Sequence, residues 1–109
     1  MSQRAAKVES IIQGVVATEL MNLLDRDAAG VTVTRVDAAE DLRNATVWVG
    51  LLGDEAEQNR LWKRVEYARG GVQAALSGRM TTKFVPRLHF KRDTGGEYAA
   101  HIDRVLRQL

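Results

Sequence analysis

Residues 61–76, LWKRVEYARGGVQAAL, hold the pattern that decides the fold. Apolar residues recur along this stretch in steps of three and four, the spacing of one helix face, at Leu61, Val65, Ala68, Val72, Ala75 and Leu76. The pattern keeps its phase across Gly70 and Gly71, although two adjacent glycines ordinarily end a helix. The sequence therefore predicts two helical pieces that share one core and are joined by a kink.

Local signals place two strands before this helix. Asp54 and Glu57 have the spacing of a capping box, so the helix is predicted to begin just after Gly53. Residues 31–37 and 44–52 are rich in valine and threonine and alternate in character, which predicts a hairpin of two strands. The face of the second strand that is expected to meet the core carries Ala45, Val47, Val49 and Leu51.

The ends of the chain complete an α+β pattern. An amphipathic helix is predicted first, with apolar residues at Val8, Ile11, Ile12, Val15, Val16, Leu20, Leu23 and Leu24. Pro86 opens a third strand, in which Leu88 and Phe90 alternate with Arg87, His89 and Lys91. A short closing helix, predicted to pack on one face of the resulting three-stranded sheet, carries Tyr98, Ile102, Val105, Leu106 and Leu109.

Composition is that of one small globular domain. The 109 residues are 45% hydrophobic and 28% charged, so we expect a single domain over residues 1–109. There is no cysteine, which excludes disulfides and thiolate metal sites and fits a reducing compartment. No apolar run approaches the roughly 18 residues of a membrane span. We therefore expect a cytoplasmic protein.

Charge is distributed unevenly along the chain. Residues 60–92 hold nine bases and one acid, a net charge of +8, whereas the other residues sum to −6. A concentrated basic surface attracts nucleic-acid phosphates, and the acidic remainder discourages indiscriminate binding. The residues predicted to bind RNA are Arg60, Lys63, Arg64, Arg69, Arg79, Lys83, Arg87 and Lys91.

Two structural expectations accompany this set. We expect Ala68 and Gly70 to form the kink, with backbone strain at Gly70 that makes a β-branched residue costly there. We also expect the bases of the kinked helix to share one accessible surface, so that changing Lys63, Arg64 and Arg69 together to glutamate leaves the fold intact.

The predicted order of helix, strand, strand, kinked helix and strand is that of a type II KH domain, and the chain resembles the ribosome-binding factor A family over nearly its whole length. The resemblance is carried by VTRV at 33–36 leading through DLRNATVWV at 41–49, by ARG at 68–70, and by FVPRLHF at 84–90 with Asp93. This family has an Ala-x-Gly kink where other KH domains have a GxxG loop, and Ala68-Arg69-Gly70 falls at that place. The literal GxxG at residues 50–53 ends a strand and is apolar inside, so we interpret it as unrelated.

The resemblance implies a function that depends on binding and not on catalysis. It implies binding to the immature small (30S) ribosomal subunit and its 16S rRNA, near the end of assembly, in support of rRNA folding and end processing. An assembly GTPase is a further candidate partner. We expect a monomer that uses neither membrane nor DNA, and no cofactor, metal or catalytic residue.

The sequence also allows functions other than binding to the small subunit. The chain could dock on a ribosomal protein or an assembly GTPase, or bind single-stranded RNA as a general KH domain. An enzyme would need His89 or His101 to act with a nearby carboxylate such as Asp93, and no known catalytic motif supports that reading. Trp48 and Trp62 could either pack or stack on bases.

Overall fold

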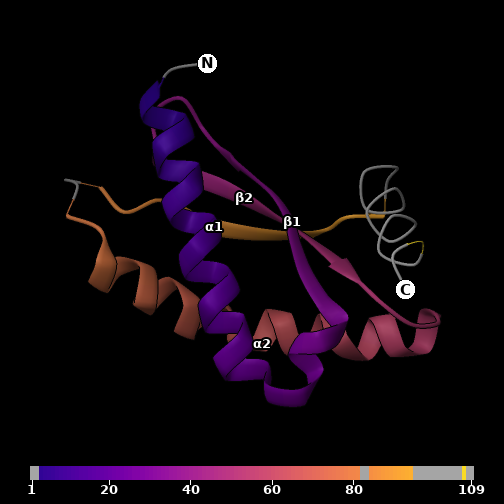
Figure 1. Ribbon diagram of the computed structural model, residues 1–109. Coiled ribbons are helices and arrows are strands. Elements are labelled where there is room, and N and C mark those ends of the chain that lie inside the picture. Colours follow the sequence, from indigo (N-terminus) through magenta and orange to yellow (C-terminus); the bar gives the residue numbers. More distant parts are fainter. Residues whose placement is uncertain (1–2, 82–83, 95–106, 108–109) are drawn as a thin grey trace.

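The computed structural model describes residues 3–81, 84–94 and 107, which form a three-stranded sheet with two helices on one face (Figure 1). The elements are α1 (Gln3–Leu24), the 3-10 helix η1 (Asp25–Gly30), β1 (Val31–Ala38), β2 (Asn44–Leu51), α2 (Glu55–Arg79) and β3 (Arg87–Arg92). This confirms the α+β fold and the predicted order of elements. The apolar residues of the predicted closing helix lie outside the described residues.

The sheet has β2 at its centre, in the order β1-β2-β3. β1 is antiparallel to β2, with Val31 opposite Leu51, whereas β3 is parallel to β2, with Asn44 opposite Arg87. The register of the β1–β2 pair shifts between Val33 and Arg35, as at a β-bulge. A parallel pair requires a long crossover connection, and α2 supplies it.

The core lies between the helices and one face of the sheet. The predicted inward residues of β2 are all buried, as are Leu61, Val65 and Val72 of α2. Two residues assigned to the core face of α1 are instead partly exposed: Ile11 is 38% exposed and Leu23 is 43% exposed. The buried residues of α1 are Ala5, Val8, Ile12, Val15, Val16, Leu20 and Leu24.

The N-terminus of α2 is capped as the sequence predicts. The backbone N–H of Glu57 donates a hydrogen bond to Asp54 Oδ1 at 2.8 Å. The capping carboxylate satisfies one of the donors that the first helical turn leaves unpaired. The helix therefore begins at Glu55, immediately after this cap.

The middle of α2 differs from the expected geometry in two respects. Two helical pieces were predicted, whereas one helix continues through Gly70 and Gly71 without interruption and changes direction along its length (Figure 1). A Cβ at Gly70 would meet no heavy atom within 4 Å, whereas a Cβ at Gly71 would lie 3.2 Å from Leu23 Cδ1. The expectation of strain at Gly70 is therefore wrong, because its backbone is helical and it has room for a side chain. The close contact with α1 is at Gly71 instead.

Candidate nucleic-acid interface

The structure places seven of the eight predicted RNA-binding bases, and they lie on separate surfaces. Arg60 and Arg64 lie against η1 and the end of α1, where they are held by tertiary contacts. The outer parts of α2 and β3 carry the exposed side chains of Lys63, Arg69, Arg79, Arg87 and Lys91. Lys83 lies outside the described residues.

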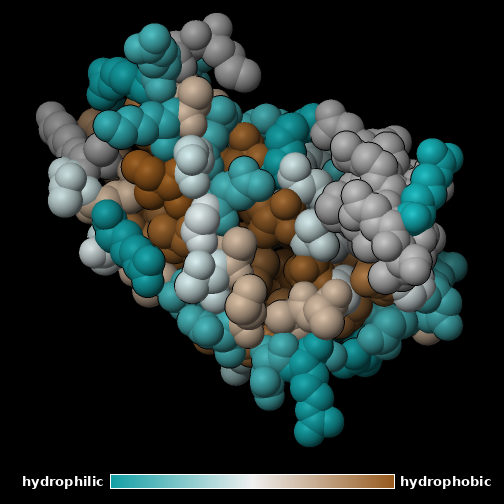
Figure 2. Space-filling view, in the orientation of Figure 1, coloured by the Kyte–Doolittle hydropathy of each residue, from teal (hydrophilic) through white to brown (hydrophobic). Residues whose placement is uncertain are grey.

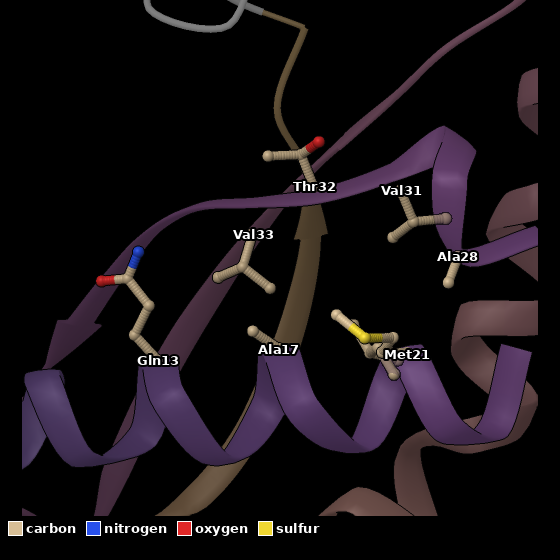
Figure 3. Close-up of a pocket in the computed structure, with 8 residues that line it drawn as sticks. Gln13, Ala17, Met21, Ala28, Val31, Thr32 and Val33 are labelled. Atoms are coloured by element: carbon tan, nitrogen blue, oxygen red, sulfur yellow. The ribbon is translucent and has the colours of Figure 1, made fainter.

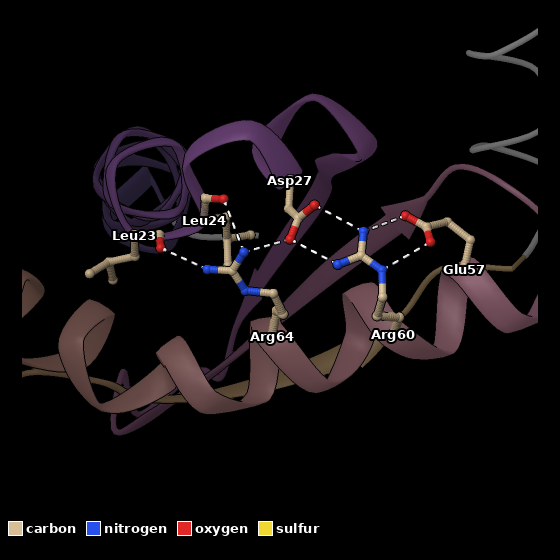
Figure 4. A network of polar contacts seen from close by, with 6 residues as sticks. All are labelled: Leu23, Leu24, Asp27, Glu57, Arg60 and Arg64. Atoms are coloured by element: carbon tan, nitrogen blue, oxygen red, sulfur yellow. Dashed lines mark hydrogen bonds and ion pairs between the residues drawn. The ribbon is translucent and has the colours of Figure 1, made fainter.

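Arg60 and Arg64 are bound by Asp27 of η1 (Figure 4). Two nitrogens of Arg60 donate to the two carboxylate oxygens of Asp27, at 2.9 and 3.1 Å, and its Nε donates to Glu57 Oε2 at 3.0 Å. Arg64 donates to the same Asp27 and to the backbone carbonyls of Leu23 and Leu24, at 3.3 and 3.4 Å. Arg64 thus satisfies carbonyls at the C-terminus of α1, where a positive charge is also favoured by the helix dipole.

This network lowers the pKa of Asp27 to about 2 from its ordinary 3.8, because hydrogen bonds from Arg60 and then Arg64 stabilise the carboxylate. Hydrogen bonds to Glu57 and then to Asp27 raise the pKa of the Arg60 guanidinium. Since the pKa of Asp27 is lower in the folded chain, its contribution to stability is present above pH 3.8 and is lost as the pH falls towards 2.

The predicted shared surface of the kinked helix is therefore only partly present. Arg60 and Arg64 join α2 to η1 and α1, so they contribute to the fold although their side chains remain 51% and 43% exposed. Changing Arg64 to glutamate would place a carboxylate beside Asp27 and the carbonyls of α1. We therefore expect the triple glutamate variant to be less stable than the natural chain, because Arg64 is one of its three positions.

Lys63 and Arg69 remain as accessible bases on the middle of α2. Neither side chain forms a hydrogen bond or an ion pair within the described part of the chain. Tyr67, one turn after Lys63 on the same helix face, is 94% exposed. Tyr67 is not among the residues predicted to bind RNA, although its position opposite the apolar seam indicates that it faces solvent.

The side-chain amide of Gln73 joins α2 to the edge of β3. Gln73 Oε1 accepts from the backbone N–H of Leu88 at 2.9 Å, and Gln73 Nε2 donates to the carbonyl of Pro86 at 2.9 Å. The side chain thus pairs with the outer edge of β3 as a neighbouring strand would. Arg69 lies one turn before Gln73, so it lies on the same side of α2, the side that meets the edge of β3.

β3 presents its bases on the face of the sheet that is turned away from the helices. Leu88 is 1% exposed on the core side, and the neighbouring Arg87, His89 and Lys91 are exposed. Beside the start of β3, the guanidinium carbon of Arg43 lies 4.8 Å from the centre of the Phe84 ring. Arg43 and Phe84 were not predicted as site residues, and Phe84 is 47% exposed.

The two tryptophans have different surroundings. Trp62 packs against the edge of the core, and the guanidinium carbon of Arg92 lies 5.9 Å from its ring centre. Trp48 lies on the open face of the sheet, where its Nε1 donates to Asp37 Oδ2 at 3.1 Å. Both are partly buried, so neither is a freely exposed ring.

A hollow between α1 and β1 (Figure 3) has a volume of about 240 Å³. It is lined by Gln13, Ala17, Leu20, Met21, Ala28, Val31, Thr32 and Val33, without a charged side chain. Figure 2 shows apolar side chains gathered in the hollows of this face of the molecule, with hydrophilic side chains around them. Since phosphate binding requires cations, this hollow is unsuited to a nucleic-acid backbone.

The candidate catalytic and metal-binding side chains of residues 3–81 and 84–94 form ordinary contacts within the fold. His89 Nε2 lies 2.9 Å from Asn44 Oδ1, and Ser77 donates to the carbonyl of Gln73 within its own helix. No group of three or more acidic or histidine side chains is arranged there to hold a metal ion. Neither described helix is long and apolar enough to cross a membrane.

The GxxG sequence at residues 50–53 has a structural role. Gly50 and Leu51 are buried at the end of β2. Gly53 has a φ of +103°, and a Cβ there would lie 2.8 Å from the side chain of Glu57. The second glycine is thus required by the turn into α2, which agrees with its interpretation as unrelated to a KH loop.

Comparison with known proteins gives one consistent result. The family model described as ribosome-binding factor A matches residues 4–106. A ribosome-binding factor A from Thermomicrobium roseum is 32% identical over 109 residues, covering 99% of this chain and 84% of the relative.

Solved structures agree with this result. The crystal structure of ribosome-binding factor A from Thermus thermophilus superposes with a TM-score of 0.68 at 25% identity, covering 81% of this chain and 94% of that one. A homology model of the Thermus thermophilus factor, fitted into a cryo-EM map of its complex with the 30S subunit, has a TM-score of 0.59 at 26% identity. That alignment covers 78% of this chain and 90% of the other.

Proposed function

Because this chain belongs to the ribosome-binding factor A family, we propose that it binds the immature small ribosomal subunit through 16S rRNA. The family model covers nearly the whole chain. The similar Thermus thermophilus factor has been fitted into a map of a 30S complex, which supports the same partner here. In this proposal the protein acts late in assembly and assists rRNA folding and end processing by binding alone.

The observation that carries the proposal is a set of exposed bases on neighbouring parts of α2 and β3: Lys63, Arg69, Arg79, Arg87 and Lys91. Arg69 lies on the side of α2 that Gln73 joins to β3. Arg92 of β3 also donates to Asn59 of α2 at 2.9 Å. The two elements therefore form a rigid support on which cations can meet several phosphates of a folded RNA.

The same arrangement explains why Arg60 and Arg64 are excluded from the proposed interface. Their guanidinium groups are occupied by Asp27, Glu57 and the end of α1. Breaking these contacts to bind RNA would cost the interactions that position α2. We therefore propose that RNA contacts are made by the exposed bases, with Tyr67 beside Lys63 as an additional contact.

One feature of the structure favours a second candidate function, the binding of a protein partner. The apolar hollow between α1 and β1 is bordered by Met21, which is 66% exposed. Exposed methionine beside an apolar hollow is typical of adaptable protein-binding surfaces. This surface would suit docking on a ribosomal protein or an assembly GTPase.

Sedimentation with ribosomal particles tests the proposed partner. When the purified chain is mixed with free small subunits, free large subunits or assembled ribosomes, we expect it to co-migrate with the small subunits and only slightly with the other two. The rRNA surfaces available on a free small subunit are partly covered in an assembled ribosome. Equal association with all three particles, or none with small subunits, would contradict the proposal.

A further inference from the structure

The open face of the sheet holds a tryptophan between two cations. The strand register places Arg35 opposite Trp48 on one side, and Lys91 opposite Trp48 on the other. The guanidinium carbon of Arg35 lies 5.1 Å from the centre of the Trp48 ring, and Lys91 Nζ lies 5.8 Å from it. Three residues that are far apart in the sequence thus form one row across the three strands.

The position of the Trp48 ring is fixed by β1. Its Nε1 donates to Asp37 Oδ2 at 3.1 Å, and the same carboxylate oxygen lies 3.1 Å from Arg35 Nε. The polar atom of the indole is therefore already satisfied by the protein. Trp48 is partly exposed on a face that contributes nothing to the core between the sheet and the helices. A further interaction of this side chain with a ligand would use its aromatic surface.

The charges around Trp48 indicate which class of ligand this face can bind. The side chains of Arg35, Arg87 and Lys91 are exposed on this face, and the carboxylate of Asp37 is paired with Arg35 and Trp48. Neighbouring cations bind phosphates, and an aromatic ring among them stacks on planar bases. Unpaired nucleic acid supplies both groups, whereas a paired helix keeps its bases within the stack.

We propose that the open face of the sheet binds an unpaired stretch of RNA, with a base stacked on Trp48 and its phosphates bound by Lys91 and Arg87. The proposal rests on the proposed rRNA-binding function and adds Trp48 of the open face to the exposed bases of α2 and β3. On binding, the base replaces part of the cation contact with the ring, and the displaced cation moves to a phosphate. Because every base has an aromatic face, the site discriminates weakly among sequences.

The first test follows the fluorescence of Trp48 and leaves this residue unchanged. In the variant Trp62→Phe, Trp48 is the sole tryptophan, and its fluorescence is followed while an oligouridylate of about ten nucleotides is added, a length within the range that such surfaces bind. We expect saturable quenching, and the same result with an oligoadenylate. Emission that stays unchanged while a labelled oligonucleotide becomes bound would overturn the proposal.

The second test measures affinity for the same oligonucleotides by fluorescence anisotropy. Trp48→Ala is expected to weaken binding by about 5- to 100-fold, the range for loss of one stacked base, and Trp48→Phe by less. Trp62→Phe is the matched control and should bind as the natural chain does. Natural affinity in a folded Trp48→Ala variant would contradict the stacking contact.

Sedimentation distinguishes this proposal from the function on which it rests. If the chain binds small subunits but Trp48 does not respond to unpaired RNA, the open-face contact is refuted and the proposed function stands. If the chain binds neither small subunits nor oligonucleotides, both are refuted. A Trp48 response to unpaired RNA without small-subunit binding would support the open-face contact and refute the proposed partner.

Discussion

Changing Lys63 and Arg69 together to glutamate is expected to weaken binding to small subunits by about 100-fold at physiological salt, roughly tenfold for each lost phosphate contact and its replacement by repulsion. Both side chains are exposed and form no ion pair within the described part of the chain. The fold should be retained, since surface substitutions usually change stability by only about 0.5 kcal/mol. Affinity is measured by co-sedimentation and folding by urea denaturation.

The matched control is Arg4→Glu with Lys7→Glu on α1. These two bases are also exposed, and the double change alters the net charge by the same amount. They lie near the N-terminal end of α1, at the opposite end of that helix from its junction with η1 (Figure 1). The control should bind nearly as well as the natural chain. If both double variants lose affinity equally, overall charge rather than the α2 surface governs binding.

Changing Arg64 to glutamate is expected to lower the free energy of unfolding by about 2 kcal/mol, because the new carboxylate would face the C-terminal carbonyls of α1 and the carboxylate of Asp27. The lost contacts are partly exposed, so solvent screening keeps the cost below that of a buried pair. The measurement is urea denaturation, in which the midpoint should fall clearly.

Lys63→Glu is the control for this effect. It makes the same change in charge at the preceding position of α2, where the side chain faces solvent. Its urea midpoint should match that of the natural chain. Equal stability of the two variants would mean that the Asp27 network contributes little to the fold, and that Arg64 can be released to bind RNA.

Local pattern was sufficient to predict α1, α2 and the three strands, because each depends on the spacing of residues close together in the sequence. The seam from Leu61 to Leu76 and the cap at Asp54 are both present in the structure. The hairpin and the strand after Pro86 are likewise present at nearly the predicted residues. These features need no knowledge of distant contacts.

The site was less predictable because its geometry depends on distant residues. Asp27 precedes Arg60 and Arg64 by 33 and 37 residues, so a count of bases could not show that these two are occupied. The contacts of Trp48 with Arg35 and Lys91 depend on the pairing of three strands. The parallel register of β3 follows from the path of α2 rather than from any local signal. Charge counting located the basic segment but could not show which of its bases are paired within the fold.

The salt dependence of binding to free small subunits tests the central claim most directly. If the exposed bases of α2 and β3 bind rRNA phosphates, log affinity should fall linearly with log salt concentration with a slope between about −2 and −4, as expected for a few phosphate contacts. The Lys63→Glu and Arg69→Glu double variant should have a slope shallower by about two. A slope near zero would contradict the account, because it would indicate docking through an uncharged surface such as the hollow between α1 and β1.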